Sequence, residues 1–373
     1  MKKYLFPALC ATLFAFAGCS DDDNVVPPPT IDPVEEAHTA YVLNQGSMFS
    51  GIDGTLDVLV ESDSTYLSKQ FFAVNGQSLG DSPQEGVVYG SHLGDVEMGV
   101  VYGSHLYIAV YGSNLVWVLD RQTLSIKAMV QTNEPEGICA AEGAVFVSNN
   151  DGYVSRIDTT TFSVTDHVAV GPNPAQMLAV GKYVYVSISD GYTSNNQYAN
   201  GFKVAKIDAE SCEVTSQIAV GMNPGPLCAD NQGNVYVVAR GNYGDIAPAV
   251  WKIHTNDAAF YFCEGSDVAC NGSTLYVLNN YTNWYANPVV SILTYAAYDV
   301  ADGSCITNKL LEGQPQPEAP TFIRVNPRDG NVYMGSNASS NDYTSPGYLY
   351  RYDANGKFVA KYNAGVAPCS IIF

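Results

Sequence analysis

The residue types that usually carry catalysis or bind metals are not grouped in this sequence. The histidines fall in no HExxH or HxH pattern, the spacing that brings two imidazoles onto one metal ion. These residues are His38, His92, His105, His167 and His254. We also predict no nucleophile elbow and no glycine-rich phosphate loop. The sequence therefore favours a binding protein over an enzyme, and it predicts no catalytic residue, catalytic cofactor or metal ligand.

The cysteines are also spread along the chain, without the paired CxxC spacing of zinc sites. Cys263 and Cys270 flank one expected loop, and we consider a disulfide between them in an oxidising compartment. The other cysteines that follow the leader are expected to be small buried side chains. The loop carboxylates are too dispersed to be paired from the sequence; they include Asp53, Asp190, Asp245 and Asp342.

A different chemistry is concentrated in NNYTNWYANP, residues 279–288, with two Tyr, one Trp and four Asn. A tight turn would need only Asn-Gly. Aromatic rings offer large contact areas to a ligand, and Asn side chains supply adaptable hydrogen bonds. Other expected loops carry the same residue types. We predict a ligand-binding surface lined by Tyr192, Asn195, Asn196, Tyr198, Tyr243, Asn280, Tyr281, Asn283, Trp284, Tyr285 and Tyr343.

A repeated unit determines where these loops lie. An alternating segment with a central aromatic residue occurs seven times, as TAYVLNQG from residue 39, HLYIAVYG from 105, AVFVSNND from 144, YVYVSISD from 183, NVYVVARG from 234, TLYVLNNY from 274 and NVYMGSNA from 331. Its period of two and its β-branched and aromatic residues predict a strand. One expected strand precedes each copy and two follow it. Each unit is therefore a four-stranded antiparallel sheet, and we expect strands throughout.

The two ends of the chain complete one unit between them. The C-terminal segment PCSIIF, residues 368–373, has the pattern of a first strand. Its partner is TAYVLNQG, at the start of the repeats. A closed ring leaves no exposed sheet edge between the ends of the array. We predict an all-β fold over residues 38–373, a seven-bladed β-propeller closed by the C-terminal strand pairing with the N-terminal blade.

One irregularity interrupts the second unit, where GVVYGSHL occurs at residues 86–93 and again at 99–106. Only the second copy continues directly into YIAVYG. The sequence therefore predicts MGVVYG, residues 98–103, as the first strand of that unit. The first copy is expected to be a duplication tolerated in a surface loop.

Because the strands of a blade alternate in direction, the connections between them alternate between two faces. One face receives short turns in which Asp158, Asp208 and Asp353 recur, and we interpret these residues as turn caps. The other face receives the long loops rich in Tyr, Trp, Phe and Asn. The predicted ligand-binding residues are therefore expected on one face.

The N-terminus has the pattern of an exported lipoprotein. Residues 1–18 contain two Lys and a short apolar run, as in a signal peptide. FAGC places Cys19 at the position of a lipidated residue. Residues 19–37 are acidic and then rich in Pro, which predicts an extended tether. We expect a lipid-anchored protein of the outer membrane, exposed at the cell surface.

The charge balance argues against some partners. The chain has 17 basic and 37 acidic residues, a net charge of −20. Such a surface repels phosphate backbones and anionic lipid headgroups. We therefore expect no nucleic-acid partner, and membrane contact only through the lipid anchor.

Several segments resemble a known family. They are YVLNQGSMFSGIDGTL at residues 41–56, NGQSLGD at 75–81, IDTTTFSVTDHVAVGPNPAQ and IDAESCEVTSQIAVGMNPGP. With the acidic leader, they are similar to the YncE-like propeller lipoproteins, and most of all to the BtuG-type cobalamin-binding lipoproteins. The resemblance implies capture of cobalamin (vitamin B12) or a related corrinoid, and its transfer to a TonB-dependent outer-membrane transporter. The duplicated GVVYGSHL departs from the family pattern.

Three alternatives use the same scaffold. A glycan would also stack on Tyr and Trp and hydrogen-bond to Asn, so a glycan-binding surface lipoprotein is the second hypothesis. A propeller hydrolase or lactonase is the third, and a purely structural surface protein is the fourth.

Overall fold

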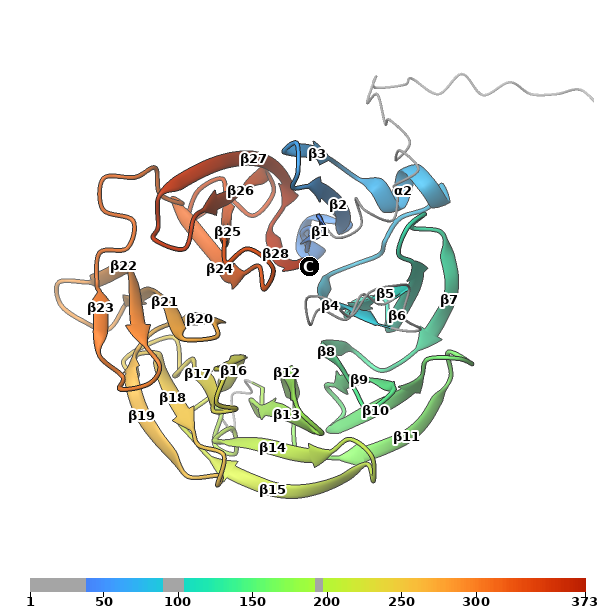
Figure 1. Ribbon diagram of the computed structural model, residues 1–373, viewed down its shortest axis with the longest axis horizontal. Coiled ribbons are helices and arrows are strands. Elements are labelled where there is room, and N and C mark those ends of the chain that lie inside the picture. Colours follow the sequence, from blue (N-terminus) through green and yellow to red (C-terminus); the bar gives the residue numbers. More distant parts are fainter. Residues whose placement is uncertain (1–37, 90–103, 192–196) are drawn as a thin grey trace, which may run out of the picture.

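The computed structural model describes residues 38–89, 104–191 and 197–373. In these ranges the chain forms seven four-stranded antiparallel sheets, arranged as blades around a common axis (Figure 1). The predicted all-β seven-bladed propeller is therefore confirmed. The leader, the tether and Cys19 lie outside the described residues, as do Tyr192, Asn195 and Asn196 of the predicted site.

Each blade has its first strand nearest the axis and its fourth at the rim (Figure 1). Blade 1 consists of β28 (Pro368–Ile372), β1 (Thr39–Asn44), β2 (Thr55–Val60) and β3 (Thr65–Leu67). Blade 2 consists of β4 (Pro83–Tyr89), β5 (His105–Val110), β6 (Leu115–Asp120) and β7 (Ile126–Gln131). Blade 3 consists of β8 (Pro135–Ala141), β9 (Ala144–Asn149), β10 (Tyr153–Asp158) and β11 (Val164–Ala169).

The remaining blades follow in chain order. Blade 4 consists of β12 (Pro174–Val180), β13 (Tyr183–Ile188), β14 (Lys203–Asp208) and β15 (Glu213–Ala219). Blade 5 consists of β16 (Pro224–Ala229), β17 (Val235–Ala239), β18 (Ala249–Ile253) and β19 (Ala259–Glu264). Blade 6 consists of β20 (Asp267–Asn271), β21 (Thr274–Asn283), β22 (Val290–Asp299) and β23 (Cys305–Thr307). Blade 7 consists of β24 (Ala319–Val325), β25 (Val332–Asn337), β26 (Pro346–Tyr352) and β27 (Phe358–Val366).

The core lies between neighbouring blades. Tyr107 of β5, for example, packs in one cluster with Ile138 of β8 and Val145 of β9. The central aromatic residue of every second strand is buried, namely Tyr41, Tyr107, Phe146, Tyr185, Tyr236, Tyr276 and Tyr333. Removing such a side chain from water contributes about 1.5–3 kcal/mol. The aromatic residue that identified each repeat therefore packs the blade against its neighbours.

The ring is closed by backbone pairing between the ends of the chain. β28 pairs antiparallel with β1, with Tyr41 opposite Ile372 and Val42 opposite Ile371. This confirms the predicted closure. A buried carboxylate adds a second link between blades 7 and 1, because Glu61 accepts hydrogen bonds from the Tyr333 hydroxyl and from Arg328, the latter at 2.9 Å.

The structure corrects one strand assignment. The first copy of the duplicated segment forms the inner strand of blade 2, since β4 runs through Gly86 and pairs with β5. The expected strand at 98–103 and most of the second copy lie outside the described residues, and the second copy ends in the start of β5. The physical reason lies upstream. Pro83 opens β4 as Pro135, Pro174, Pro224 and Pro368 open theirs, and the first residue of a strand is where a sheet tolerates Pro.

The disulfide considered between Cys263 and Cys270 is not formed in the structure, in which all the described cysteines are free thiols. Cys263 lies on β19, the rim strand of blade 5, whereas Cys270 lies on β20, the axial strand of blade 6. The chain crosses from rim to axis between them. Their closeness in sequence therefore does not become closeness in space.

Two short helical segments depart from the expectation of strands throughout. They are the 3₁₀ turn η1 (Met48–Ser50) and the helix α2 (Gln70–Asn75). Phe71 of α2 is buried against Trp117, with ring centroids 5.4 Å apart. The helix ends at Gly76, whose φ of 66° favours glycine. α2 therefore covers the join between blades 1 and 2.

The predicted turn caps are confirmed. The Asp158 carboxylate accepts hydrogen bonds from the backbone N–H groups of Thr160 and Thr161. The bonds from Thr161 and Thr160 hold the pKa of Asp158 below its usual value. The Asp208 and Asp353 carboxylates accept equivalent backbone hydrogen bonds from residues two to four positions further along the chain. These carboxylates therefore shape the turns.

The Glu61 link leads to a stability prediction. Glu61→Ala leaves Arg328 partly buried without its carboxylate, so we expect a loss of about 3 kcal/mol in the free energy of unfolding. Urea denaturation followed by tryptophan fluorescence measures it. The control is Glu312→Ala, which removes an ion pair to Lys309 that is exposed at both ends and should cost less than about 1 kcal/mol. Equal losses in the two variants would contradict the link.

Candidate ligand-binding face

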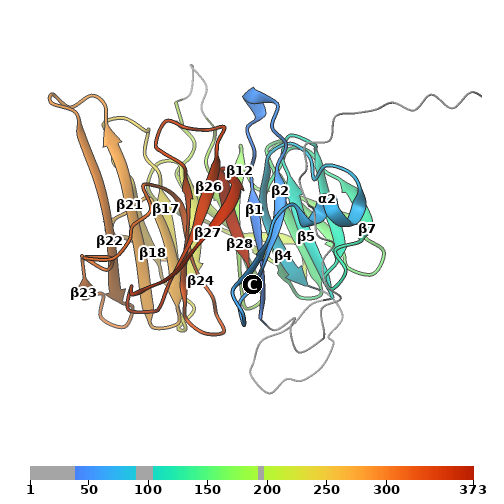
Figure 2. The same ribbon diagram turned by 90° about the horizontal axis from the view of Figure 1, so that it is seen from above.

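The long connections gather on one face of the disc, which we call the loop face. It consists of the loops between the second and third strands of each blade and the connections between blades. Figure 2 shows the β21–β22 hairpin and the β1–β2 loop projecting on the same side. Contacts between loops agree, because the rings of Tyr198 and Tyr243 lie 6.2 Å apart although they come from blades 4 and 5. The described aromatic residues of the predicted site therefore share one face.

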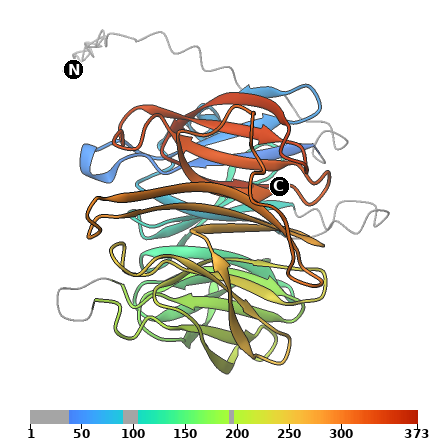
Figure 3. The same ribbon diagram turned by 90° about the vertical axis from the view of Figure 1, so that its left-hand side faces the viewer.

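The most prominent element of this face is the β21–β22 hairpin of blade 6. β21 and β22 pair over ten positions, from Thr274 opposite Asp299 to Asn283 opposite Val290. β20 pairs only with the Thr274–Leu278 part of β21, and β23 only with Ala297 and Tyr298. The distal half of the hairpin therefore extends beyond its sheet, as Figure 3 also shows. The segment NNYTNWYANP, residues 279–288, forms the end of this hairpin.

Strand alternation divides the hairpin into two faces. Tyr281 donates a hydrogen bond from its hydroxyl to the backbone oxygen of Gly244 in blade 5. Asn280 and Thr282, its neighbours in sequence, line a groove toward blade 7 instead. Tyr281 was predicted to line the ligand site together with Asn280. The structure places these two residues on opposite faces, and Tyr281 braces the hairpin.

The Trp284 groove lies between this hairpin and blade 7. It has a volume of about 580 Å³. Its walls are Asn280, Thr282, Trp284, Ser291, Ile292 and Leu293 on one side and Glu318, Ala319, Pro320, Asn337, Ser340, Asn341 and Tyr343 on the other. Trp284 is 70% exposed and Tyr343 is 61% exposed. Two aromatic rings that no protein contact buries therefore border one polar groove.

A second concavity, the Phe49 hollow, adjoins the first at Tyr343. It has a volume of about 470 Å³ and is lined by Gln45, Gly46, Ser47, Met48, Phe49, Ser82, Gln84, Tyr111, Tyr343 and Ala367. The Phe49 side chain is fully exposed. Sequence analysis recognised the loop that contains Met48 and Phe49 but selected no residue from it. The sequence pattern that could have identified this part of the site is GSMFSG, residues 46–51, in which Met48 and Phe49 lie between glycines in a loop of the binding face.

The other predicted residues have structural partners. Tyr198 is only 8% exposed, and its ring packs edge-on against Tyr243. One edge of the Tyr285 ring contacts Gly244 of blade 5, since a Cβ at Gly244 would lie 2.3 Å from it, while the residue is 78% exposed. The Asn283 side chain accepts hydrogen bonds from the backbone N–H groups of Tyr285 and Ala286. Of the described predicted residues, Asn280, Trp284 and Tyr343 line the Trp284 groove.

One amide oxygen beside this groove lacks a hydrogen-bond partner. Asn337 ends β25 at the loop face and lines the groove. Its Oδ1 atom is buried and has no hydrogen-bond partner among the described residues. A buried acceptor without a partner costs about 1–3 kcal/mol. The structure therefore leaves this cost at Asn337 without a compensating protein contact among the described residues.

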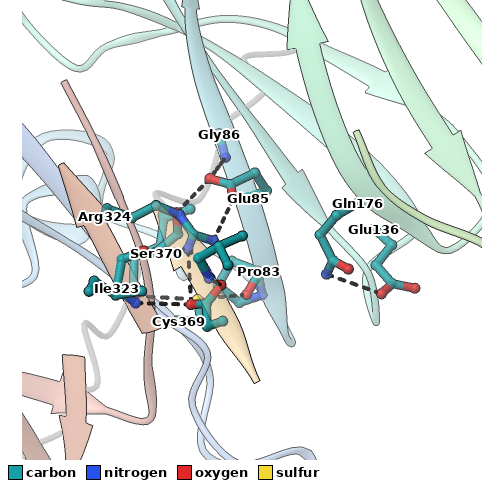
Figure 4. A network of polar contacts seen from close by, with 12 residues as sticks. Pro83, Glu85, Gly86, Glu136, Gln176, Ile323, Arg324, Cys369 and Ser370 are labelled. Atoms are coloured by element: carbon teal, nitrogen blue, oxygen red, sulfur yellow. Dashed lines mark hydrogen bonds and ion pairs between the residues drawn. The ribbon is translucent and has the colours of Figure 1, made fainter. Parts of the chain in front are cut away.

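Sequence analysis also missed a polar network around the axis. Arg324 of β24 donates to Asp267 of β20 at 3.1 Å and lies 3.8 Å from Glu85 of β4. Figure 4 shows this group, and a second in which Gln176 donates to Glu136. Burial raises the pKa of the Glu85 and Glu136 carboxyl groups, although arginine charges oppose the shift. The inner strands therefore carry polar groups inward, below the loop face.

The loop carboxylates contribute to the local structure of their loops. Asp342 accepts hydrogen bonds from the Ser345 side chain and from the backbone N–H groups of Ser345 and Thr344, and these bonds lower its pKa to about 2. Asp190 accepts a hydrogen bond from the backbone of Asn200, and Asp245 accepts one from the side chain of Asn242.

The sequence contains one GxSxG pattern, the motif of a nucleophile elbow, which was not considered above. Residues 76–80 read GQSLG, which is a GxSxG pattern. The nucleophile elbow joins a strand to a following helix, whereas this segment follows α2 and leads toward β4. The Ser78 hydroxyl donates a hydrogen bond to Asp53. The segment therefore has a different structural context from an elbow.

Among residues 38–89, 104–191 and 197–373, no group of three or more His, Cys, Asp or Glu is placed to hold a metal ion. No helix in the same part of the chain is long and apolar enough to cross a membrane.

Comparisons with known proteins identify the family and confirm the fold. Residues 41–368 match DUF5074, a family described as a domain of unknown function. The chain therefore belongs to this family. No curated protein matches it. A quinonprotein alcohol dehydrogenase-like protein from Bacteroides thetaiotaomicron is 13% identical with a TM-score of 0.59, covering 91% of this chain and 78% of that one. Hydrazine synthase from Kuenenia stuttgartiensis is 16% identical with a TM-score of 0.56, covering 72% and 86%. At these identities the likeness concerns the fold alone.

The axial carboxylates lead to a pH prediction. Because burial raises the pKa of Glu136 in the folded protein above its usual 4.5, its ionised form destabilises the fold, and stability falls as pH rises through the folded pKa. Glu136→Gln removes this penalty. We expect a higher Tm than wild type at pH 7.5, with the difference vanishing near pH 4. Thermal unfolding followed by circular dichroism measures it.

The matched control is Glu142→Gln on the exposed turn that follows β8, which should leave the Tm unchanged at both pH values. A lower Tm for Glu136→Gln at pH 7.5 would mean that attraction to Arg240 outweighs burial.

Proposed function

We propose that this member of the DUF5074 family is a cell-surface lipoprotein that captures cobalamin, or a related corrinoid, on its loop face and passes it to a TonB-dependent outer-membrane transporter. The observation that carries the proposal is the position of Tyr343, which borders both the Trp284 groove and the Phe49 hollow. A ligand lying over Tyr343 would contact both concavities. The exposed rings of Trp284, Tyr343 and Phe49 would then surround it.

The dimensions favour a broad ligand. Sites for small molecules usually have volumes of about 300–1,000 Å³, so a small metabolite would occupy one concavity of 580 or 470 Å³ and leave the other empty. A corrinoid is a wide macrocycle that can cover the ridge between them. Its carboxamide side chains can donate hydrogen bonds to the Glu318 carboxylate, which lines the groove.

The charge of the concavities agrees with this ligand class. Among the described residues that line them, Glu318 is the single charged side chain. The whole chain carries a net charge of −20. Anionic ligands are repelled by such a surface, whereas the weak net charge of a corrinoid is compatible with it. Lipidation at Cys19 would hold the propeller at the membrane through the 19–37 tether.

A glycan-binding surface lipoprotein is the second candidate. The exposed rings of Trp284 and Tyr343 on either side of a polar groove also suit a sugar, which stacks its apolar face on an aromatic ring. A hydrolase or lactonase is a third candidate, and turnover that a chelator abolishes would favour it.

Calorimetry separates the first two candidates. The mature chain is titrated with cyanocobalamin and, in parallel, with a panel of neutral oligosaccharides. We expect saturable binding of cyanocobalamin with a Kd in the micromolar range or below, and none for the sugars. Binding of a sugar alone would replace the proposal with the glycan hypothesis. Absence of both at micromolar concentrations would contradict each of them.

The aromatic rings provide the variant test. Trp284→Ala and Tyr343→Ala should each weaken cyanocobalamin binding about tenfold, since a stacked ring contributes roughly 0.5–1.5 kcal/mol beyond the area it buries. Phe260→Ala is the matched control, because it removes an equally exposed ring from β19, at the rim. An equal effect of all three substitutions would mean that the ligand does not lie on the loop face.

The anchor has its own test. Cys19→Ala removes the thiol that would be acylated, so we expect the variant to leave the membrane fraction and to lose the mass of the lipid. Fractionation and mass spectrometry of the intact protein detect both changes. A variant that stays membrane-bound would contradict lipid anchoring at this residue.

A further inference from the structure

Two cysteines meet at the boundary between blades 5 and 6. Cys228 lies on β16 and Cys270 on β20, the axial strands of these neighbouring blades. β16 and β20 pack directly against each other. The two thiols belong to one hydrophobic cluster with Tyr236 and Leu275, and the Cys270 thiol lies close enough to the Cys228 thiol to contribute, in addition to burial, to the raised pKa of Cys228. Residues that are 42 positions apart in sequence therefore lie as neighbours across the boundary between the two blades.

The other described cysteines have different neighbours. Cys263 hydrogen-bonds to the Tyr298 hydroxyl, and Cys369 is directed at the backbone oxygens of Leu43 and Pro83. Cys305 is exposed at the rim on β23. Cys263 and Cys305 also act on each other electrostatically, but both lie on rim strands, whereas Cys228 and Cys270 lie on axial strands that pack together.

We propose that Cys228 and Cys270 form a disulfide that joins blades 5 and 6 when the chain folds in an oxidising environment. The oxidant is a disulfide of a small thiol, such as glutathione disulfide. One protein thiolate attacks it and releases one glutathione. The second protein thiolate then attacks the mixed disulfide and releases the other. The two protein thiols lose two electrons and two protons, and one glutathione disulfide becomes two glutathione thiols.

The surroundings of the pair determine when this reaction occurs. Burial raises the pKa of the Cys228 thiol well above its usual value, so little reactive thiolate exists in the folded protein. Oxidation is therefore expected during folding, and the finished bond is shielded from reducing agents. Closing the bond brings the sulfur atoms to about 2.05 Å, across a boundary where β16 and β20 already pack together.

The consequence concerns the support of the loop face. The disulfide would enclose residues 228–270, which include β17, β18 and the loop at 240–248. Gly244 in this loop accepts the hydrogen bond of Tyr281 from the blade 6 hairpin. The disulfide would therefore connect blades 5 and 6 near the axis. The hydrogen bond between Tyr281 and Gly244 connects the same two blades near the loop face.

The experiment is refolding of the mature chain in glutathione buffers from fully reduced to fully oxidised, followed by acid quenching, alkylation and peptide mapping. Trypsin is expected to release Cys228 in residues 207–240 and Cys270 in residues 253–309, because the nearest Lys and Arg residues define these fragments. We expect a disulfide-linked pair of these peptides in the oxidised sample. The oxidised chain should also melt on the order of 5 °C higher than the reduced chain.

Variants identify the bond, because both peptides contain other cysteines. The link and the gain in Tm should persist in Cys212→Ala, Cys263→Ala and Cys305→Ala, and both should be lost in Cys228→Ala and Cys270→Ala. The wild-type chain provides a readout without any substitution, since the linked peptide pair is 2 Da lighter than the sum of its reduced parts. Complete alkylation of Cys228 and Cys270 in the oxidised wild-type chain would overturn the proposal, as would a link that survives Cys270→Ala.

Discussion

The structure depends on one set of backbone hydrogen bonds, between β28 and β1. Without them the first blade would lack its axial strand, and its edge would be open to other chains. With them, seven sheets enclose a common axis and every connection is assigned to one of two faces. Because Glu61 also accepts hydrogen bonds from Tyr333 and Arg328 of blade 7, side chains reinforce the same junction. The loop face exists as a single surface only because the ring is closed.

On that surface, the β21–β22 hairpin has two roles on its two faces. One face holds it to blade 5 through Tyr281 and Gly244, and the other lines the Trp284 groove. A protruding two-stranded hairpin is marginally stable by itself. The contact with blade 5 therefore allows Trp284 to remain exposed on a supported element. Rigid aromatic side chains on a supported scaffold lose little entropy when a ligand binds.

The basic residues are few, and several of them lie where blades meet. Arg324 of blade 7 joins Asp267 of blade 6 and Glu85 of blade 2, and Lys206 of blade 4 lies 2.7 Å from Asp257 of blade 5. These pairs are partly buried, where charges are weakly screened by salt. Many of the acidic side chains instead cap turns or face solvent. The ion pairs between blades therefore stabilise the ring, whereas the remaining acidic side chains give the surface its negative charge.

The sequence by itself determined the architecture, because each repeat carries its own strand pattern and its own buried aromatic residue, from Tyr41 to Tyr333. Periodicity is local, and so it can be recognised without knowing any distant contact. It also determined that Tyr243, Trp284 and Tyr343 lie on connections of one face. The assignment of the first duplicated GVVY to β4 could have been made too, from the Pro that opens five of the seven inner strands.

Only the tertiary structure decided how those residues are used. The rings of Tyr198 and Tyr243 pack together across blades 4 and 5. Tyr281 faces away from Asn280. Phe49 and Tyr343, from blades 1 and 7, line the same hollow of the loop face. Cys270 approaches Cys228 instead of its sequence neighbour Cys263. In each case the partner belongs to another blade, and the distance between blades is set by packing around the ring, which no local pattern encodes.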